Sequence, residues 1–141
     1  MHHIVHATSD LQIARCFPVM AQLRPHLVET EFVSRVRRQQ LEGYQLVFLE
    51  EDGRVTSVAG FRLGECLYSG RYLYVDDLVT DETRRSAGHG GLLLDWLVAH
   101  AKENTCDALT LDSGVQRFAA HRFYLHHRMD ITCHHFSLKL K

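Results

Sequence analysis

Three glycines within four residues, Gly88, Gly90 and Gly91, form the part of the sequence whose composition points most directly to chemistry. Glycine lets a backbone approach a ligand closely, and a helix start presents unpaired N–H groups and a positive dipole end. Arg84 and Arg85, just before them, supply charge that pairs with anions. The segment therefore indicates a diphosphate cradle, although a turn that only reverses the chain would have similar glycines.

Two common nucleotide motifs fit this segment poorly. A Rossmann GxGxxG would need its third glycine where Leu93 stands, and it normally follows the first strand of its unit. A Walker A motif needs Gly-Lys-Ser/Thr, and the segment contains no lysine. Neither motif is predicted here.

Alternating and helical apolar patterns around this segment predict the elements that position it. The expected order is β-α-α-β-β-β-α-β-α-β. Strands are expected at Ile4 and Val5 and over 44–51, 55–65, 72–80, 108–111 and 131–140. Helices are expected after the N-cap candidates at 8–10, near 30–41, over 92–102 and over 117–128, with Pro18 kinking or delaying the first.

Hairpin-connected strands followed by a βαβ crossover indicate a mixed α+β fold. Asp52-Gly53 is the hairpin signal between two of the strands. We expect a central mixed, mostly antiparallel sheet with helices on both faces. No repeat, low-complexity tract or linker is visible in the 141 residues, so a single domain over 1–141 is predicted.

The helix expected near 30–41 has an apolar side and a basic side. Phe32, Val33 and Val36 are expected to face inward, and Arg35, Arg37 and Arg38 mostly outward. A basic cluster of this kind is more typical of a solvated face than of a binding patch.

Composition excludes several classes of function. A net charge of −1 gives no electrostatic footprint for nucleic acid or for a membrane surface. No apolar run approaches the roughly 20 residues that cross a bilayer, and the first residues do not form a secretory signal. The four cysteines have no CxxC spacing, which favours reduced thiols and a cytoplasmic location.

Eleven histidines, some in adjacent pairs, could suggest a metal site. Adjacent residues diverge in both strands and helices, so such pairs rarely chelate one ion. No HExxH is present, and no metal is expected.

The segment resembles the acyl-coenzyme A signature of the GNAT family of N-acetyltransferases. The family pattern Arg/Gln-x-x-Gly-x-Gly/Ala is matched by Arg85, Gly88 and Gly90, and the strand before it by residues 76–81. A second family segment, Ala-x-x-Phe-Tyr, is matched by Ala120-His121-Arg122-Phe123-Tyr124. The resemblance extends over nearly the whole chain.

The resemblance implies a coenzyme site in two parts. The backbone of Leu78, Val79 and Thr80 would pair with the pantetheine arm like an added strand. The pyrophosphate would be held by Arg85 and the backbone amides of Ser86, Ala87, Gly88, His89, Gly90 and Gly91. Arg117 is included on the coenzyme side, although it replaces an Asn that relatives often carry, and Arg128-Met129 replaces a usual Gly-Phe.

Acetyl transfer to an amine needs a base for the amine, a donor for the thioester carbonyl and an acid for the departing thiolate. The resemblance places the acid at Tyr124 and a carboxylate base at Asp76. Asp77 follows it, and neighbours in a strand face opposite sides unless a bulge intervenes. His121, His134 and His135 are alternative bases.

The acceptor is less determined than the donor. An acetyl-CoA-dependent transfer to a small primary amine is expected, and a protein or peptide amine or a non-catalytic coenzyme-binding domain are the alternatives. The loop 23–27 would help to form the acceptor pocket, and its Arg24 could meet a substrate carboxylate. A homodimer is also expected, from the apolar last strand around Phe136 and Leu138.

Overall fold

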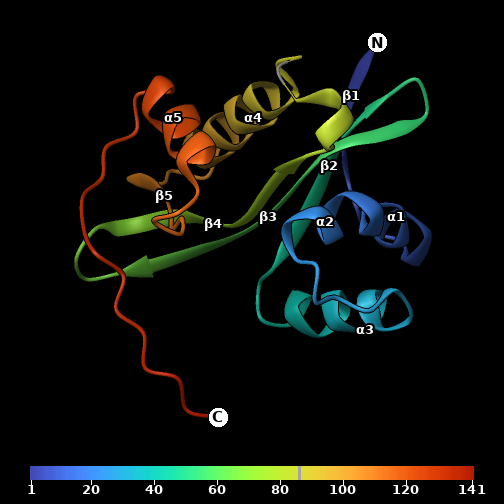
Figure 1. Ribbon diagram of the computed structural model, residues 1–141. Coiled ribbons are helices and arrows are strands. Elements are labelled where there is room, and N and C mark those ends of the chain that lie inside the picture. Colours follow the sequence, from blue (N-terminus) through green and yellow to red (C-terminus); the bar gives the residue numbers. More distant parts are fainter. Residues whose placement is uncertain (86) are drawn as a thin grey trace. The chain divides into compact units, whose positions relative to one another are not determined.

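The computed structural model describes residues 1–85 and 87–141, which form two compact units (Figure 1). The first unit is Met1–Thr110, and the second is Leu111–Lys141. The strands are β1 (His2–His6), β2 (Gln45–Glu51), β3 (Arg54–Cys66), β4 (Gly70–Thr80) and β5 (Ala108–Leu111). The helices are α1 (Asp10–Arg15), α2 (Phe17–Leu23), α3 (Glu29–Gln40), the 3₁₀ turn η1 (Glu82–Arg84), α4 (His89–Glu103) and α5 (Phe118–His126).

The strands form one five-stranded sheet in the order β1-β2-β3-β4-β5. β1 with β2, β2 with β3 and β3 with β4 are antiparallel pairs. Asp52 and Gly53 link β2 to β3 with φ values of 52° and 76°, which a two-residue hairpin turn requires at both of its positions. The mixed α+β fold and this hairpin are confirmed.

Helices cover both faces of the sheet in the first unit, as expected (Figure 1). The side chains of β2 alternate between the two faces of the sheet. Leu46 and Phe48 belong to the core beneath α1, α2 and α3. Val47 and Leu49, which point the other way, are also buried, on the side covered by α4. A strand buried on both faces explains the nearly continuous apolar run seen in the sequence.

The first helical segment is divided at Cys16 into α1 and α2. Ser9 caps α1 by accepting from the Gln12 N–H at 3.1 Å, and the Gln12 side chain completes the capping box. Pro18 lies in the first turn of α2, where its missing N–H costs no helical hydrogen bond. The interruption expected at Pro18 is therefore the start of a second helix, α2.

The prediction of a last strand over 131–140 is wrong. The second unit contains α5 followed by a segment without strand structure among the described residues. Ile131, Phe136 and Leu138 are exposed there. Alternating apolar residues indicate a strand face, but a strand also needs a hydrogen-bonded edge, which the pattern cannot specify. The homodimer expected from this strand stays a prediction.

Two expectations about the whole chain can be compared with the described residues. None of the helices in the described part of the chain is sufficiently long and apolar to cross a bilayer. All four cysteines are free, as expected from their spacing.

Candidate active site

A bulge in β4 brings two neighbouring carboxylates to one place. Gly60 of β3 faces Asp77, and Phe61 faces Val75, so Asp76 is an extra residue in β4. In a regular strand Asp76 and Asp77 would point to opposite faces. Because of the bulge, both line the same pocket.

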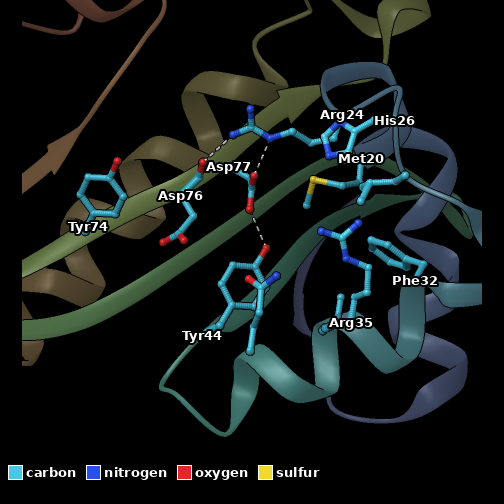
Figure 2. Close-up of a pocket in the computed structure, with 12 residues that line it drawn as sticks. Met20, Arg24, His26, Phe32, Arg35, Tyr44, Tyr74, Asp76 and Asp77 are labelled. Carbon is cyan, nitrogen blue, oxygen red and sulfur yellow. Dashed lines mark hydrogen bonds and ion pairs between the residues drawn. The ribbon is translucent and has the colours of Figure 1, made fainter. Parts of the chain in front are cut away.

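The pocket lies between β4 and the helices α2 and α3 and has a volume of about 230 Å³ (Figure 2). Its apolar wall includes Met20, Phe32 and Val36, and its polar groups come from β4, α3 and the loop after α2. The expectation that loop 23–27 helps to form a pocket is supported, since Arg24, His26 and Leu27 line it.

Both oxygens of Asp77 are engaged by neighbouring side chains (Figure 2). The Tyr44 hydroxyl donates to Oδ2 at 2.7 Å, and Nε of Arg24 donates to Oδ1 at 3.0 Å. Nη2 of Arg24 also donates to the backbone carbonyl of Asp76 at 2.9 Å. Arg24 therefore ties the end of α2 to the bulge, and its guanidinium is already paired with protein groups.

Tyr44 reaches Asp77 only because Gly60 has no side chain. A Cβ on Gly60 would lie 1.8 Å from the Tyr44 hydroxyl oxygen and 2.3 Å from the adjoining ring carbon. Tyr44 is 5% exposed, and burial, followed by the nearby Asp77 carboxylate, raises the pKa of its phenol. The phenol thus stays protonated and donates to the carboxylate.

We expect Gly60→Ala to lower the free energy of unfolding by about 1–3 kcal/mol, the usual cost of overpacking a buried site. The Tyr44 ring is enclosed and must move away from Asp77. Gly64→Ala on the same strand is the matched control, because the group it meets is the half-exposed end of Tyr72. Urea unfolding of both variants measures the difference. Equal stability of the two would contradict the proposed role of Gly60.

Asp76 differs from Asp77 in having one oxygen without a partner. Nε of Arg62 donates to Oδ2 at 3.1 Å, while Oδ1 is buried and accepts no hydrogen bond within the described chain. Desolvation raises the pKa of this carboxyl, and the Arg62 guanidinium partly opposes that effect. A carboxylate with a raised pKa and a free oxygen is suited to accept a proton.

Arg35 lies in the pocket, which corrects the expectation that it faces mostly outward. It follows the buried Phe32 by three positions on α3, and residues at this spacing share one helix face. Arg37, by contrast, pairs with Asp10 at the surface at 2.7 Å, and Arg38 is exposed. The helical spacing already separates Arg35 from Arg37, which is two positions away, but not from Arg38, which is three positions away.

The backbone at the end of β4 is paired on its β3 side, where Ser57, Val58 and Ala59 face Thr80, Val79 and Leu78. On the other side, β5 begins near Arg71, whose carbonyl accepts from the Asp107 N–H at 2.6 Å. The four residues of β5 span about 13 Å, whereas Leu78 lies about 23 Å along β4 from Arg71. β5 is therefore too short to pair with the end of β4.

The glycine segment forms the start of α4. Gly88 is the N-cap with φ of 84°, a left-handed conformation that side chains rarely adopt. Among the described residues no side chain caps this helix, and its first turn contains no acidic residue. The first N–H groups of α4, at His89, Gly90 and Gly91, are therefore available to an anion. Ser86, also expected in this cradle, lies outside the described residues.

The approach to this helix start is held by Asp81. Asp81 is the N-cap of η1, and its Oδ1 accepts from the Thr83 N–H at 3.1 Å. The same oxygen accepts from the Gln22 side chain at 3.4 Å. These hydrogen bonds, that of the Thr83 amide above all, lower the pKa of Asp81. Arg85 follows in an extended conformation, exposed, with Nε 3.4 Å from the Thr80 carbonyl. Arg85 thus lies beside the end of β4, near the helix start.

The side chain of His89 turns away from the surface. It is 4% exposed, and its Nε2 lies 3.0 Å from Oε2 of Glu51, which Nδ1 of His2 also approaches at 3.2 Å. The three potential ligand atoms lie within 4.8 Å of one another. Arg84 approaches the other Glu51 oxygen at 3.8 Å and compensates its charge. Sequence spacing could not reveal this cluster, since its members come from three distant segments.

Residues 12–128 match the model of the acetyltransferase (GNAT) family. The chain belongs to the GNAT family. A sequence relative of this GNAT protein is the "Uncharacterized N-acetyltransferase YhdJ" of Bacillus subtilis (strain 168), 34% identical over 125 residues that cover 88% of each chain.

Solved structures of low identity share the fold of this GNAT protein. A transcriptional regulator from Bacillus halodurans C-125 matches with a TM-score of 0.86 and 20% identity, covering 99% of this chain and 100% of that one. A ribosomal-protein-alanine N-acetyltransferase from Brucella melitensis biovar Abortus 2308 matches with a TM-score of 0.85 and 14% identity over 100% of both chains. These likenesses confirm the fold class.

The remaining sequence-predicted residues of this GNAT protein lie in the second unit. Arg117 is the N-cap of α5, and Tyr124 lies within that helix. Nε2 of His121 lies 2.8 Å from the Gly114 carbonyl, and Nδ1 of His135 lies 3.5 Å from Asp112. His134 is exposed. Their proposed roles in coenzyme binding and catalysis stay predictions.

Proposed function

We propose that this GNAT protein transfers an acetyl group from acetyl-CoA to the primary amine of a small molecule. The main support for the proposal is the order of three features along and just after β4. Its bulge presents Asp76 to a small pocket, and two residues later the strand has a backbone edge that β5 does not reach. A glycine-rich helix start follows, which no side chain of the described residues caps. Acceptor site and coenzyme site are thus consecutive along one segment.

The residues at the end of β4 and at the start of α4 suit acetyl-CoA. The backbone of Leu78, Val79 and Thr80 can hydrogen-bond to the amides of a pantetheine arm, as an added strand would. The first N–H groups of α4 and the Arg85 guanidinium offer hydrogen bonds and positive charge to a pyrophosphate. Bound there, acetyl-CoA supplies a thioester whose acetyl carbon forms the new C–N bond as the C–S bond breaks.

In this proposal Asp76 accepts a proton from the acceptor amine, directly or through one water. Its free Oδ1 and its raised pKa support this role. Asp77 serves instead as a positioning residue, because Tyr44 and Arg24 occupy its two oxygens.

Tyr124 is proposed as the acid that protonates the leaving thiolate. We expect Tyr124→Phe to lower kcat by about 10²–10⁴ while acetyl-CoA affinity changes little, since the phenolic proton acts only in the transition state. Steady-state kinetics and a thermal melt of the same preparation test this. Phe123→Leu, one residue earlier on α5, is the control for a packing change. Wild-type turnover by a stable Tyr124→Phe protein would show that another group or water donates the proton.

Release of free thiol from acetyl-CoA, measured against a panel of small amines and peptides, tests the proposed function. We expect turnover with a small amine because the pocket, at about 230 Å³, is below the roughly 300 Å³ at which drug-sized ligand pockets begin. Turnover only with peptides would shift the acceptor to a protein or peptide amine. Coenzyme binding without turnover on any amine would favour a coenzyme-binding domain and contradict the proposal.

A further inference from the structure

One charged side chain and one carboxylate oxygen in the proposed acceptor pocket are left without partners once the ion pairs are assigned. Arg24 is paired with Asp77, and Oδ2 of Asp76 is paired with Arg62. Within the part of the chain that the structure describes, Arg35 takes part in no ion pair or hydrogen bond, and Oδ1 of Asp76 accepts none. The described lining of the pocket therefore includes an unpaired cation, Arg35, and a carboxylate, Asp76, whose buried Oδ1 has no partner.

These two groups belong to different walls of the pocket. Figure 2 shows Arg35 extending from α3 beside Phe32, while Asp76 comes from β4 on the other side of Tyr44. Arg35 is half-buried against the apolar wall, so its guanidinium is partly removed from water. A partly desolvated cation without a partner is unfavourable, and an anion that pairs with it gains a charge-assisted hydrogen bond.

We propose that the acceptor is a small molecule that carries an acidic group as well as its amine, with Arg35 binding the acidic group and Asp76 facing the amine. The inference rests on the proposed function, whose acceptor class it specifies. The planar guanidinium fork fits a carboxylate or a phosphate equally well. With a pocket of about 230 Å³, acceptors of amino-acid or aminoalkyl phosphate size are the appropriate class.

This charge arrangement also predicts which amines are disfavoured. An amine without an acidic group leaves Arg35 unpaired, so the site loses a charge-assisted hydrogen bond. A diamine brings a second cation close to Arg35 and is repelled. Arg24 cannot take over the anion, because its guanidinium already bonds to the Asp77 carboxylate and the Asp76 carbonyl.

The test compares each acid with its uncharged analogue. One arm pairs amino acids with their carboxamides, and the other pairs aminoalkyl phosphates with the corresponding amino alcohols. We expect the wild-type protein to show a higher kcat/KM for the acid in at least one arm. Arg35→Gln should lower the acid-to-neutral ratio of kcat/KM by about 10- to 100-fold. Comparing ratios between variants cancels the different basicity of the paired amines.

Two further variants make the result specific to the Arg35 guanidinium. Arg35→Lys keeps the positive charge and should restore part of the preference. Arg38→Gln removes an exposed arginine of the same helix and should leave the ratio at its wild-type value. The arm in which the preference is lost identifies a carboxylate or a phosphate as the acidic group.

Calorimetric titration of the preferred acid into the protein, without turnover, separates this inference from the proposed function. Binding that weakens in Arg35→Gln would support the anion site even if no amine were acetylated, and the proposed function alone would then fail. Acetylation of neutral amines as readily as acids, with an unchanged ratio in Arg35→Gln, would overturn the acceptor class but leave the transferase. Neither acid binding nor turnover would overturn both.

Discussion

Asp76→Asn is expected to lower kcat/KM by about 10²–10⁴, the contribution of a general base. The substitution keeps the shape of the side chain but removes its ability to accept the amine proton. The variant should also lose the acid limb of the pH profile, which is the fall in kcat/KM at low pH. In the wild-type protein, activity requires ionised Asp76, so kcat/KM should rise as the pH increases through the pKa of this carboxyl. Because desolvation raises that pKa, the acid limb should lie at a higher pH than the ordinary pKa of an aspartate would give.

Asp77→Asn is the matched control, one residue away in the same bulge. Its carboxylate accepts from Tyr44 and Arg24, so its loss should reduce stability. The acid limb should remain but move to lower pH, because the Asp77 charge contributes to the raised pKa of Asp76. Kinetics across pH and urea unfolding of both variants separate the two roles. Retention of the acid limb in Asp76→Asn, or its loss only in Asp77→Asn, would mean that the base is assigned to the wrong carboxylate.

Acetyl-CoA is expected to raise the melting temperature of the protein, and Gly90→Val is expected to abolish that rise. A ligand that binds only the folded state stabilises it by about 2.7 kcal/mol at a hundred times its Kd. Gly90 lies in the first turn of α4, where a valine side chain would occupy space that the proposed pyrophosphate needs. Thermal melts with and without acetyl-CoA measure the effect.

Ala99→Val is the control for adding a valine to α4. Residue 99 is exposed and more than two turns beyond Gly90, so this variant adds a valine away from the proposed cradle and should show a normal shift with acetyl-CoA. A folded Gly90→Val protein that binds acetyl-CoA as the wild type does would rule out the cradle at the start of α4.

The glycine-rich helix start could be predicted from the sequence because its signals are local. The glycines after Arg85 indicate a helix start that a ligand can approach closely. The structure shows that α4 begins there, with Gly88 in a left-handed conformation and no capping side chain among the described residues. The hairpin at Asp52-Gly53 and the helix break at Pro18 were predictable for the same reason. Each depends on the conformational preferences of one or two neighbouring residues.

The pocket beside Asp76 was not predictable in the same way, because it depends on contacts between distant segments. The bulge at Asp76 is defined by its register against Gly60, and the clamp on Asp77 comes from residues 33 and 53 positions away. The strand expected over 131–140 failed for a related reason. Its alternation indicated an apolar face but not the edge with which it would pair.

Transfer of a labelled acetyl group tests the central claim most directly. The protein is incubated with acetyl-CoA labelled in the acetyl group and with the amines that release thiol, and the products are identified by mass spectrometry. We expect the label on the amine nitrogen of a small acceptor, at a rate that falls sharply in Asp76→Asn. Label that stays on acetyl-CoA, or is released as free acetate with every amine, would contradict the assignment of this protein as an N-acetyltransferase.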